Sequence, residues 1–236
     1  MFYSNIISYG GYMIFKGWDW EKNKDNYWLT PDNDAYFLAE RFQDLGYKDI
    51  FDLGVGLGRH SIFFARRGFR VKGIDISEYA VKHLKEIAED NKLNIEVKCA
   101  NMLSIPFPDN SFDVVFSFNV IYHTDTKGFQ TVLGEIKRVL KNGGEFYFTM
   151  ISKNSVTFKD PAYPKTFVDE NTLIIDAKEA EKDVPHFYVN LDDIKNLFTA
   201  DFDFVSPIKE VETTEILPDG SFKEFSKHFV LHLKKR

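Results

Sequence analysis

The sequence predicts an α/β protein with a doubly wound, mostly parallel seven-stranded sheet, helices on both faces and a C-terminal antiparallel hairpin. Between Asp49 and Met150, short apolar runs alternate with longer amphipathic stretches, which is the pattern of strands joined by right-handed crossover helices. The apolar runs are continuous, as in strands buried on both faces. Near the C-terminus, the turn signal Leu217-Pro218-Asp219-Gly220 separates two strand-like runs and indicates a hairpin.

The individual elements follow from periodicity and from their end signals. A helix is expected over Asp34–Leu45, where apolar residues recur at helical spacing and Gly46 ends the pattern. The next hundred residues predict strands at Ile50–Leu53, Arg70–Ile74, Ile95–Lys98, Val114–Phe118 and Glu145–Met150. Helices are expected between them at Gly58–Arg67, Glu78–Asn91 and Gly128–Leu140. A last helix at Leu191–Phe198 precedes hairpin runs at Phe202–Glu212 and Phe222–Lys234. Residues 151–190 show no clear period, and such a long segment is functional or carries short elements of its own.

Composition limits the classes of function that are compatible with this chain. Hydrophobic residues make up 44% and aromatic residues 16% of the 236 residues, which is enough for a packed core. The formal net charge of −6, with acidic residues concentrated in 169–183 and 201–219, argues against a nucleic-acid partner, which would need a basic face. A solvated surface is the ordinary interpretation of such acidic clusters.

Cysteine count and hydropathy predict the compartment. Cys99 is the single cysteine, which excludes a disulfide framework and a multi-cysteine metal site, so no metal is expected and a reducing cytoplasm fits. No apolar run reaches the roughly 18 residues of a membrane span, so no membrane partner is expected. The apolar first dozen residues lack a basic leader and a cleavage site, and Met13 is a hypothetical alternative start.

A glycine-rich loop joins the first strand of the alternating region to its helix. It reads Asp52-Leu53-Gly54-Val55-Gly56-Leu57-Gly58, and glycines there allow a tight turn and the close approach of a ligand to the backbone. A tight turn without a ligand is the alternative. The dinucleotide fingerprint needs a third glycine where this chain has Arg59, which disfavours NAD and a dehydrogenase.

Asp75 stands at the end of the next strand, 21 residues after Gly54. A carboxylate there can accept hydrogen bonds from both hydroxyls of a ribose. The alternative is a helix N-cap, but Ser77 is better placed for that role before Glu78.

These residues resemble the class I S-adenosylmethionine-dependent methyltransferases. DLGVGLG (52–58) is similar to the first motif of that family, and Ile74-Asp75 is similar to the second. NMLSIPFPDNSFDVV (101–115), VVFSFNVIYH (114–123) and KRVLKNGGEFYF (137–148) continue the likeness, which covers residues 50–150 well. GRHSIFFARRGFRVKGIDIS (58–77) is similar to the tellurite-resistance and thiopurine-type branch, whose substrates are small molecules. The chain departs from the pattern at Asn101, where the family usually has an acid, and at Val55, where it often has Cys or Ala.

The resemblance implies a cofactor, S-adenosylmethionine, and a set of residues that bind it. Backbone from Gly54 through Gly56 to Gly58 would border its methionine part, and Asp52 would orient that loop. Asp75 would bind the ribose, Ile76 and Met102 would sandwich the adenine, and Asn101 would bind the adenine amino group. Ser117 and Phe118 would face the sulfonium. The whole chain would be one methyltransferase domain, comprising an aromatic lid segment (1–30), a cofactor-binding core (31–150), a substrate-side insertion (151–190) and a final helix with a hairpin (191–236).

Methyl transfer from a sulfonium needs alignment of the acceptor, exclusion of water and removal of one proton at most. A soft sulfur or metalloid acceptor needs no base. For an oxygen or nitrogen acceptor, the candidate bases are His123 and His186, and each can equally be a structural histidine. Tyr27 and Trp28 are candidate residues of a substrate lid, with ordinary packing as the alternative.

The function that the sequence predicts is methyl transfer to a small-molecule acceptor. The alternatives are a methyltransferase acting on protein or RNA, which a basic rim would support, and a cofactor-binding module without turnover. The sequence leaves the acceptor and the oligomeric state open.

Overall fold

A computed structural model describes residues 16–22, 26–175 and 182–236 of the chain. The hypothesis about the first dozen residues and Met13 lies outside these ranges. A short 3-10 helix, η1 (Asn26–Leu29), precedes the first α-helix. Among the described residues, no helix is long and apolar enough to cross a membrane.

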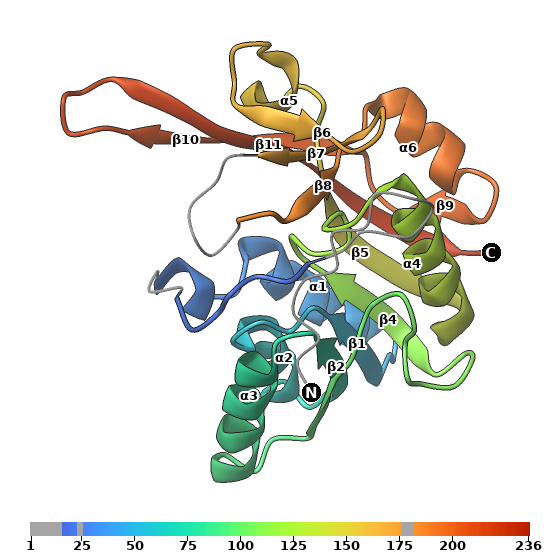
Figure 1. The fold of residues 1–236 in the computed structure, drawn as a ribbon. Coiled ribbons are helices and arrows are strands. Elements are labelled where there is room, and N and C mark those ends of the chain that lie inside the picture. The colour runs from blue at the N-terminus through green and yellow to red at the C-terminus, as the bar shows by residue number, and fades with distance from the viewer. Residues whose placement is uncertain (1–15, 23–25, 176–181) are drawn as a thin grey trace.

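The main sheet confirms the predicted fold class. Its strands run in the order β10-β11-β5-β4-β1-β2-β3 (Figure 1). Five of them are mutually parallel: β1 (Asp49–Leu53), β2 (Arg70–Asp75), β3 (Ile95–Cys99), β4 (Phe112–Ser117) and β5 (Leu140–Ile151). β11 (Phe222–Lys235) runs antiparallel to β5 and forms the expected hairpin with β10 (Lys209–Ile216). That hairpin projects beyond the rest of the molecule in Figure 1.

Helices cover both faces of the sheet because side chains alternate along its strands. On β1, Ile50 packs with α1 (Asn33–Asp44) and α2 (Arg59–Ala65), whereas the next residue, Phe51, joins the cluster on the opposite face. That opposite cluster includes residues of α4 (Thr126–Val139) and α6 (Leu191–Phe198). α3 (Glu78–Asp90) packs on β2 and β3.

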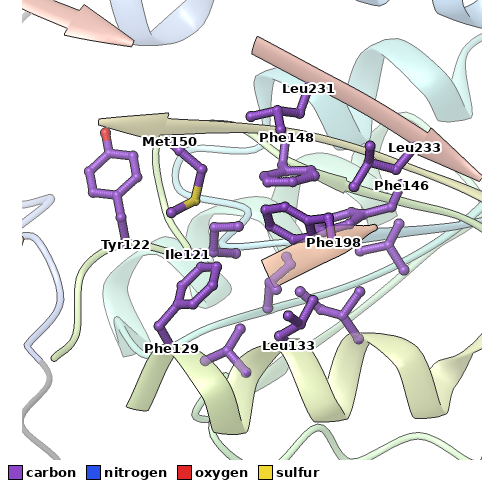
Figure 2. Packing of buried hydrophobic residues seen from close by; sticks show 14 of the residues in the cluster. Ile121, Tyr122, Phe129, Leu133, Phe146, Phe148, Met150, Phe198, Leu231 and Leu233 are labelled. Carbon is purple, nitrogen blue, oxygen red and sulfur yellow. The ribbon is translucent and has the colours of Figure 1, made fainter. Parts of the chain in front are cut away.

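Phenylalanines of β5 form the centre of the larger core. The rings of Phe146 and Phe148 are stacked, with centroids 3.9 Å apart. Figure 2 shows them between Phe129 and Leu133 of α4 on one side and leucines of β11 on the other. Burial of these large side chains stabilises the fold by about 1.5–3 kcal/mol each and fixes the position of β4, which lies beside β5.

One expectation about the C-terminal strands needs correction. The run Phe202–Glu212 is not one strand, because it divides into β9 (Phe202–Phe204) and β10. Both pair with β11, so the main sheet of the described residues has eight strands instead of the predicted seven. Pro207, which has no backbone N–H to donate, lies in the break between β9 and β10. The segment 151–190 does carry short elements of its own, which is one of the two expectations for it: it holds α5 (Val156–Lys159) and a small antiparallel sheet of β6 (Lys165–Phe167), β7 (Thr172–Ile175) and β8 (Pro185–Phe187).

A buried carboxylate joins α1, β5 and β11. Arg41 donates from Nε and Nη2 to the two oxygens of Glu145, at 3.0 and 2.7 Å. His232 Nε2 lies 2.7 Å from Oε2 of the same carboxylate. Burial alone would raise the pKa of Glu145, but the hydrogen bonds to His232 and Arg41 outweigh it and lower the pKa to about 2. Glu145 is therefore held ionised inside the fold.

Candidate functional site

The carboxyl ends of β1, β2 and β4 open into a cleft. The space free of protein atoms there, including open solvent at its mouth, is about 840 Å³. Ligands of open α/β sheets bind at this edge. Trp28 and residues of five other segments line it: 16–20, 53–60, 74–76, 100–102 and 118–123. The described residues contain no group of three or more His, Cys, Asp or Glu side chains arranged to hold a metal ion.

The glycine-rich loop after β1 forms the floor of the cleft. Gly54 and Gly56 have φ angles of +82° and +52°, in the region that favours glycine. A Cβ on Gly54 would lie 2.4 Å from the Val120 side chain, and one on Gly56 would lie 2.6 Å from the Trp20 ring. The loop is also anchored, because the N–H groups of Gly54 and Val55 both donate to the carbonyl of Ile74. Its glycines therefore allow close approach of neighbouring groups to a fixed backbone.

Asp75 is buried at the end of β2 and lines the cleft. Its Oδ2 accepts from the backbone N–H of Gly56 at 2.8 Å, and its Oδ1 accepts from that of Ser77 at 2.9 Å. The Ser77 hydroxyl caps α3 by accepting from the N–H of Ala80, as the sequence predicts. Burial raises the pKa of Asp75, and the hydrogen bonds from Ser77 and Gly56 oppose that rise. Each carboxylate oxygen can accept one more hydrogen bond.

Asp52 lies behind the loop rather than in the cleft lining. Its Oδ2 accepts from the hydroxyl of Ser61 at 2.5 Å, which ties the end of β1 to α2. Burial raises its pKa to about 7, against the opposing effects of Ser61 and Arg59. Gly58, the N-cap residue of α2, is likewise outside the lining.

Ile76, Asn101 and Met102 all line the end of the cleft near β3, where the sequence places them. The side-chain carbonyl of Asn101 already accepts from the backbone N–H of Leu103 at 2.9 Å. That oxygen has a second lone pair, and the amide nitrogen is a further donor, so Asn101 can still hydrogen bond to a ligand.

Ser117 and Phe118, at the end of β4, are both predicted to face the sulfonium, but their surroundings differ. Ser117 is fully buried, and its hydroxyl donates to the carbonyl of Leu53 at 3.0 Å, so it does not line the cleft. Phe118 and Asn119 do line it. The backbone of Asn119 has φ of 60°, and its N–H and side-chain oxygen both bond to the hydroxyl of Thr149.

Tryptophans of the N-terminal segment form the opposite wall. The rings of Trp18, Trp20 and Trp28 all contact one another, with centroid distances of 5.0 to 5.8 Å. Gly17 lies directly against Ile76, because a Cβ on Gly17 would fall 2.2 Å from that side chain. The segment 16–20 therefore crosses the cleft near the carboxyl end of β2.

A buried arginine holds the next part of the chain. Arg59 lies over the rings of Tyr27, Trp28 and Phe118 at 5.0, 4.9 and 5.3 Å. Its Nη1 also donates to the carbonyls of Tyr27 and Thr30, both at 3.1 Å. Trp28 lines the cleft, whereas Tyr27 is outside the lining and 54% exposed.

Both candidate histidines are buried, but only His123 lines the cleft. Burial, together with nearby His186 and His228, lowers the pKa of His123 well below 6.5. His186 lies behind it on β8, with ring centroids 5.0 Å apart. The Nδ1 of His186 is 2.9 Å from the carbonyl of Val184, and since a carbonyl only accepts, that nitrogen carries a proton.

Sequence reasoning missed part of the site. Trp18, Trp20 and Arg59 shape the cleft, yet no motif predicts a ligand contact for any of them. The tryptophans lie in the expected lid segment 1–30, and Arg59 lies in the helix expected at 58–67. The available signal was the concentration of all three tryptophans of the chain before residue 29.

The part of this chain that contains the glycine loop and Asp75 matches a known family of proteins. A family model described as a methyltransferase domain matches residues 50–144. Uncharacterized protein MJ0638 of Methanocaldococcus jannaschii is 33% identical over 119 residues, or 50% of this chain and 48% of that protein. Sterol 24-C-methyltransferase ERG6B of Gibberella zeae is 36% identical over 116 residues, or 47% of this chain and 30% of that protein. Each match spans less than half of the relative's own length.

A solved structure matches over a greater share of the chain. The crystal structure of an S-adenosylmethionine-dependent methyltransferase from Methanosarcina mazei superposes with a TM-score of 0.61, at 22% identity. The match covers 80% of this chain and 92% of that one. At this identity, the likeness is one of fold.

Proposed function

Residues 50–144 of this chain match a methyltransferase domain, and on that premise we propose that the chain is a class I S-adenosylmethionine-dependent methyltransferase that transfers a methyl group from S-adenosylmethionine to a small-molecule acceptor. S-adenosylmethionine is the cofactor of this family. The observation that carries the proposal is the joint placement of Asp75 and the glycine loop in one cleft at the carboxyl edge of the sheet.

The residues of the cleft fit this cofactor. The two oxygens of Asp75 each keep a lone pair, which suits the two hydroxyls of a ribose. Gly54 and Gly56 present backbone without a Cβ to the cleft, and we place the methionine part beside this backbone. Ile76 and Met102 offer apolar surfaces for the adenine, and Asn101 offers a hydrogen-bonding group for its amino nitrogen.

The residues outside the lining have supporting roles in this proposal. Asp52 positions the glycine loop through Ser61, Gly58 begins α2, and Ser117 holds the end of β4 against β1. Phe118 is the residue of that strand exit that we place beside the sulfonium. Tyr27 acts indirectly, by helping Arg59 to hold Trp28 in the wall.

When bound, the cofactor supplies an electrophilic methyl group on a cationic sulfur. The protein's contribution is to bind it through the loop and Asp75, to exclude water and to hold the acceptor in line. The three tryptophans and Phe118 provide an apolar wall for these tasks, and their π faces suit a cationic sulfur.

Three features support a small acceptor over a protein or an RNA. The segment 16–20 lies across part of the cleft, which narrows the approach for a bulky substrate. The lining is largely aromatic and apolar, as in pockets for small ligands. The acidic net charge of −6 disfavours an RNA partner. We also propose that the reaction takes place in the cytoplasm, where the exposed thiol of Cys99 would stay reduced.

Isothermal titration calorimetry with S-adenosylmethionine and with NADH tests the proposal. We expect binding of S-adenosylmethionine and of its product S-adenosylhomocysteine, and no heat from NADH. Release of S-adenosylhomocysteine on incubation with small nucleophiles, followed by mass spectrometry, then tests turnover. Failure of both adenosyl compounds to bind would overturn the proposal, and binding without turnover on any acceptor would indicate a module that only binds the cofactor.

A further inference from the structure

The indole Nε1–H of Trp18 is buried and has no hydrogen-bond partner within the described residues. Trp18 lines the cleft. A buried donor without a partner costs free energy, so such groups in native proteins usually have a bound partner when the site is filled. The Trp18 indole is therefore a donor that a ligand acceptor atom in the cleft can satisfy.

His123 lies against that indole. The two rings are stacked with an interplanar angle of 22° and centroids 6.3 Å apart. Neither ring nitrogen of His123 hydrogen bonds to any residue that the structure describes. The titratable groups around it are Tyr122 on the same segment, His186 on β8 and His228 on β11. No carboxylate is among these neighbours, and the low pKa keeps His123 neutral, and so able to accept a proton, at pH 7.

His186 fixes the position of His123. Its Nδ1–H donates to the carbonyl of Val184, which sets the orientation of its ring within β8. The His123 and His186 rings then meet edge to face at 82°. His186 is buried and outside the cleft lining, so it acts as a positioning residue.

We propose that Trp18 and His123 form the acceptor subsite, in which the indole N–H donates to the acceptor atom and His123 receives its proton, and that the acceptor is a neutral aromatic compound with a hydroxyl group. This inference rests on the proposed methyl transfer.

The chemistry of the Trp18 indole and the His123 ring favours oxygen as the atom that accepts the methyl group. A hydroxyl oxygen has two lone pairs, so one can accept from Trp18 while the other attacks, and its proton is left for His123. A neutral amine has a single lone pair, which attack would consume, leaving Trp18 without a partner. A thiol sulfur accepts hydrogen bonds only weakly, and a thiolate has no proton for His123 to remove.

The surroundings select a neutral aromatic molecule. The wall beside Trp18 is built from the rings of Trp20, Trp28 and Phe118. The two basic side chains of the lining already have partners: Arg59 is stacked on aromatic rings, and Lys16 is paired with Asp183 at 3.5 Å. A charged acceptor group would therefore compete with existing contacts, whereas an aromatic ring would extend the wall.

The step balances in atoms and charge. A carbon–oxygen bond forms as the carbon–sulfur bond breaks, the sulfur keeps the electron pair of that bond, and the hydroxyl proton moves to a ring nitrogen of His123. The products are the methyl ether, S-adenosylhomocysteine and a protonated His123, which then loses its proton to solvent.

A set of three probes with one skeleton tests the choice of atom: 2-naphthol, 2-naphthylamine and 2-naphthalenethiol. We expect 2-naphthol to be methylated with the highest kcat/KM. Trp18→Phe keeps an aromatic ring but removes the N–H, and we expect it to lower kcat/KM for 2-naphthol by roughly 10-fold. His123→Gln removes the base, and we expect it to lower kcat for 2-naphthol by roughly 10²- to 10⁴-fold. The thiol is the comparison substrate: as a thiolate it has no proton for His123 to receive, and its sulfur accepts only weakly from Trp18, so both variants should lose less activity with it than with 2-naphthol.

A binding measurement keeps the test independent of turnover. In the complex with S-adenosylhomocysteine, we expect 2-naphthol, but not naphthalene, to shift the ¹⁵N–¹H resonance of the Trp18 indole, which the Trp18→Phe variant assigns by its disappearance. Calorimetry of each variant with S-adenosylhomocysteine separates the two proposals. If the cofactor product does not bind to the wild-type protein, the proposed function fails. If it binds normally but 2-naphthol neither shifts the Trp18 resonance nor is methylated in preference to the amine and thiol, the subsite proposal is wrong.

Discussion

The carboxylate of Asp75 accepts a hydrogen bond from the backbone N–H of Gly56 at 2.8 Å, so the end of β2 and the glycine loop after β1 form one unit. We predict that Asp75→Ala lowers the affinity for S-adenosylmethionine by roughly 100-fold or more, because two hydroxyls lose a charged acceptor and each such bond contributes about 1.5–3 kcal/mol. Calorimetry measures the loss, and circular dichroism checks that the variant is folded. Glu96→Gln, on the surface of neighbouring β3, is the control. Equal affinities for Asp75→Ala and wild type would show that Asp75 does not bind the cofactor.

Glu145 should make stability depend on pH in the acid range. Its pKa of about 2 is below the 4.5 of an unperturbed glutamate, so its contribution to the free energy of unfolding is complete above pH 4.5 and is lost as the pH falls toward 2. The shift corresponds to about 3 kcal/mol.

We predict that Glu145→Gln costs about 3–5 kcal/mol at pH 7, because Arg41 and His232 lose their buried partner. The difference from wild type should shrink as the pH falls from 4.5 to 2. Urea unfolding at several pH values measures this. Glu96→Gln breaks exposed pairs with Lys72 and Lys98 and should cost less than about 1 kcal/mol. A pH-independent difference for Glu145→Gln would contradict the prediction.

A comparison of Gly54 with Gly220 separates the free-energy cost of backbone strain from the cost of side-chain crowding. Their φ angles are nearly equal, +82° and +80°, but a Cβ meets Val120 at Gly54 and nothing within 4 Å at Gly220. We predict that Gly220→Ala lowers the free energy of unfolding by about 1 kcal/mol, the cost of a left-handed residue. Gly54→Ala should lose a further 1–3 kcal/mol or so, because Val120 must move. Denaturant unfolding measures both variants. Similar losses of unfolding free energy would contradict the prediction, because they would show that Val120 moves aside without a free-energy cost.

Arg59 should hold residues 27–30 against α2. Lysine cannot reproduce both the hydrogen bonds to the carbonyls of Tyr27 and Thr30 and the stacking of a planar guanidinium. We predict that Arg59→Lys increases hydrogen exchange of the backbone amides in 26–30 by roughly 10-fold. Arg66→Lys, at an exposed position on the C-terminal side of the same helix, is the control and should leave that exchange unchanged. If hydrogen exchange is unaltered in Arg59→Lys, the prediction is wrong, and contacts of the tryptophans hold residues 27–30 in place instead.

The sequence predicts the core of this fold well, because each strand and helix between residues 49 and 140 carries its own period and end signals. β1 begins one residue earlier than expected, and α6 matches its expected range. β5 begins at Leu140 instead of Glu145, because Leu140 pairs with Phe112 of β4 before the glycine pair, a contact between distant residues that periodicity does not encode.

The candidate site likewise has a part that local sequence predicts and a part that depends on contacts between distant residues. The glycine loop and Asp75 are local in sequence, so their spacing alone places them together. Trp18 and Trp20 reach the cleft from an irregular segment, and their positions depend on contacts with His123 and Gly56, which are far away along the chain. The sequence predicts Tyr27 and Trp28 together as lid residues, yet Trp28 lines the cleft whereas Tyr27 is exposed outside the lining.

The clustering of every tryptophan of this chain in one wall of the cleft gives the protein a built-in optical reporter. Trp18, Trp20 and Trp28 lie within 5.8 Å of one another between ring centroids, and all three line the cleft. Light of 295 nm excites tryptophan selectively, so the resulting fluorescence comes from these three residues. The intrinsic emission of the unlabelled, unmodified chain should follow occupancy of the cleft in real time, including the order in which two ligands enter it.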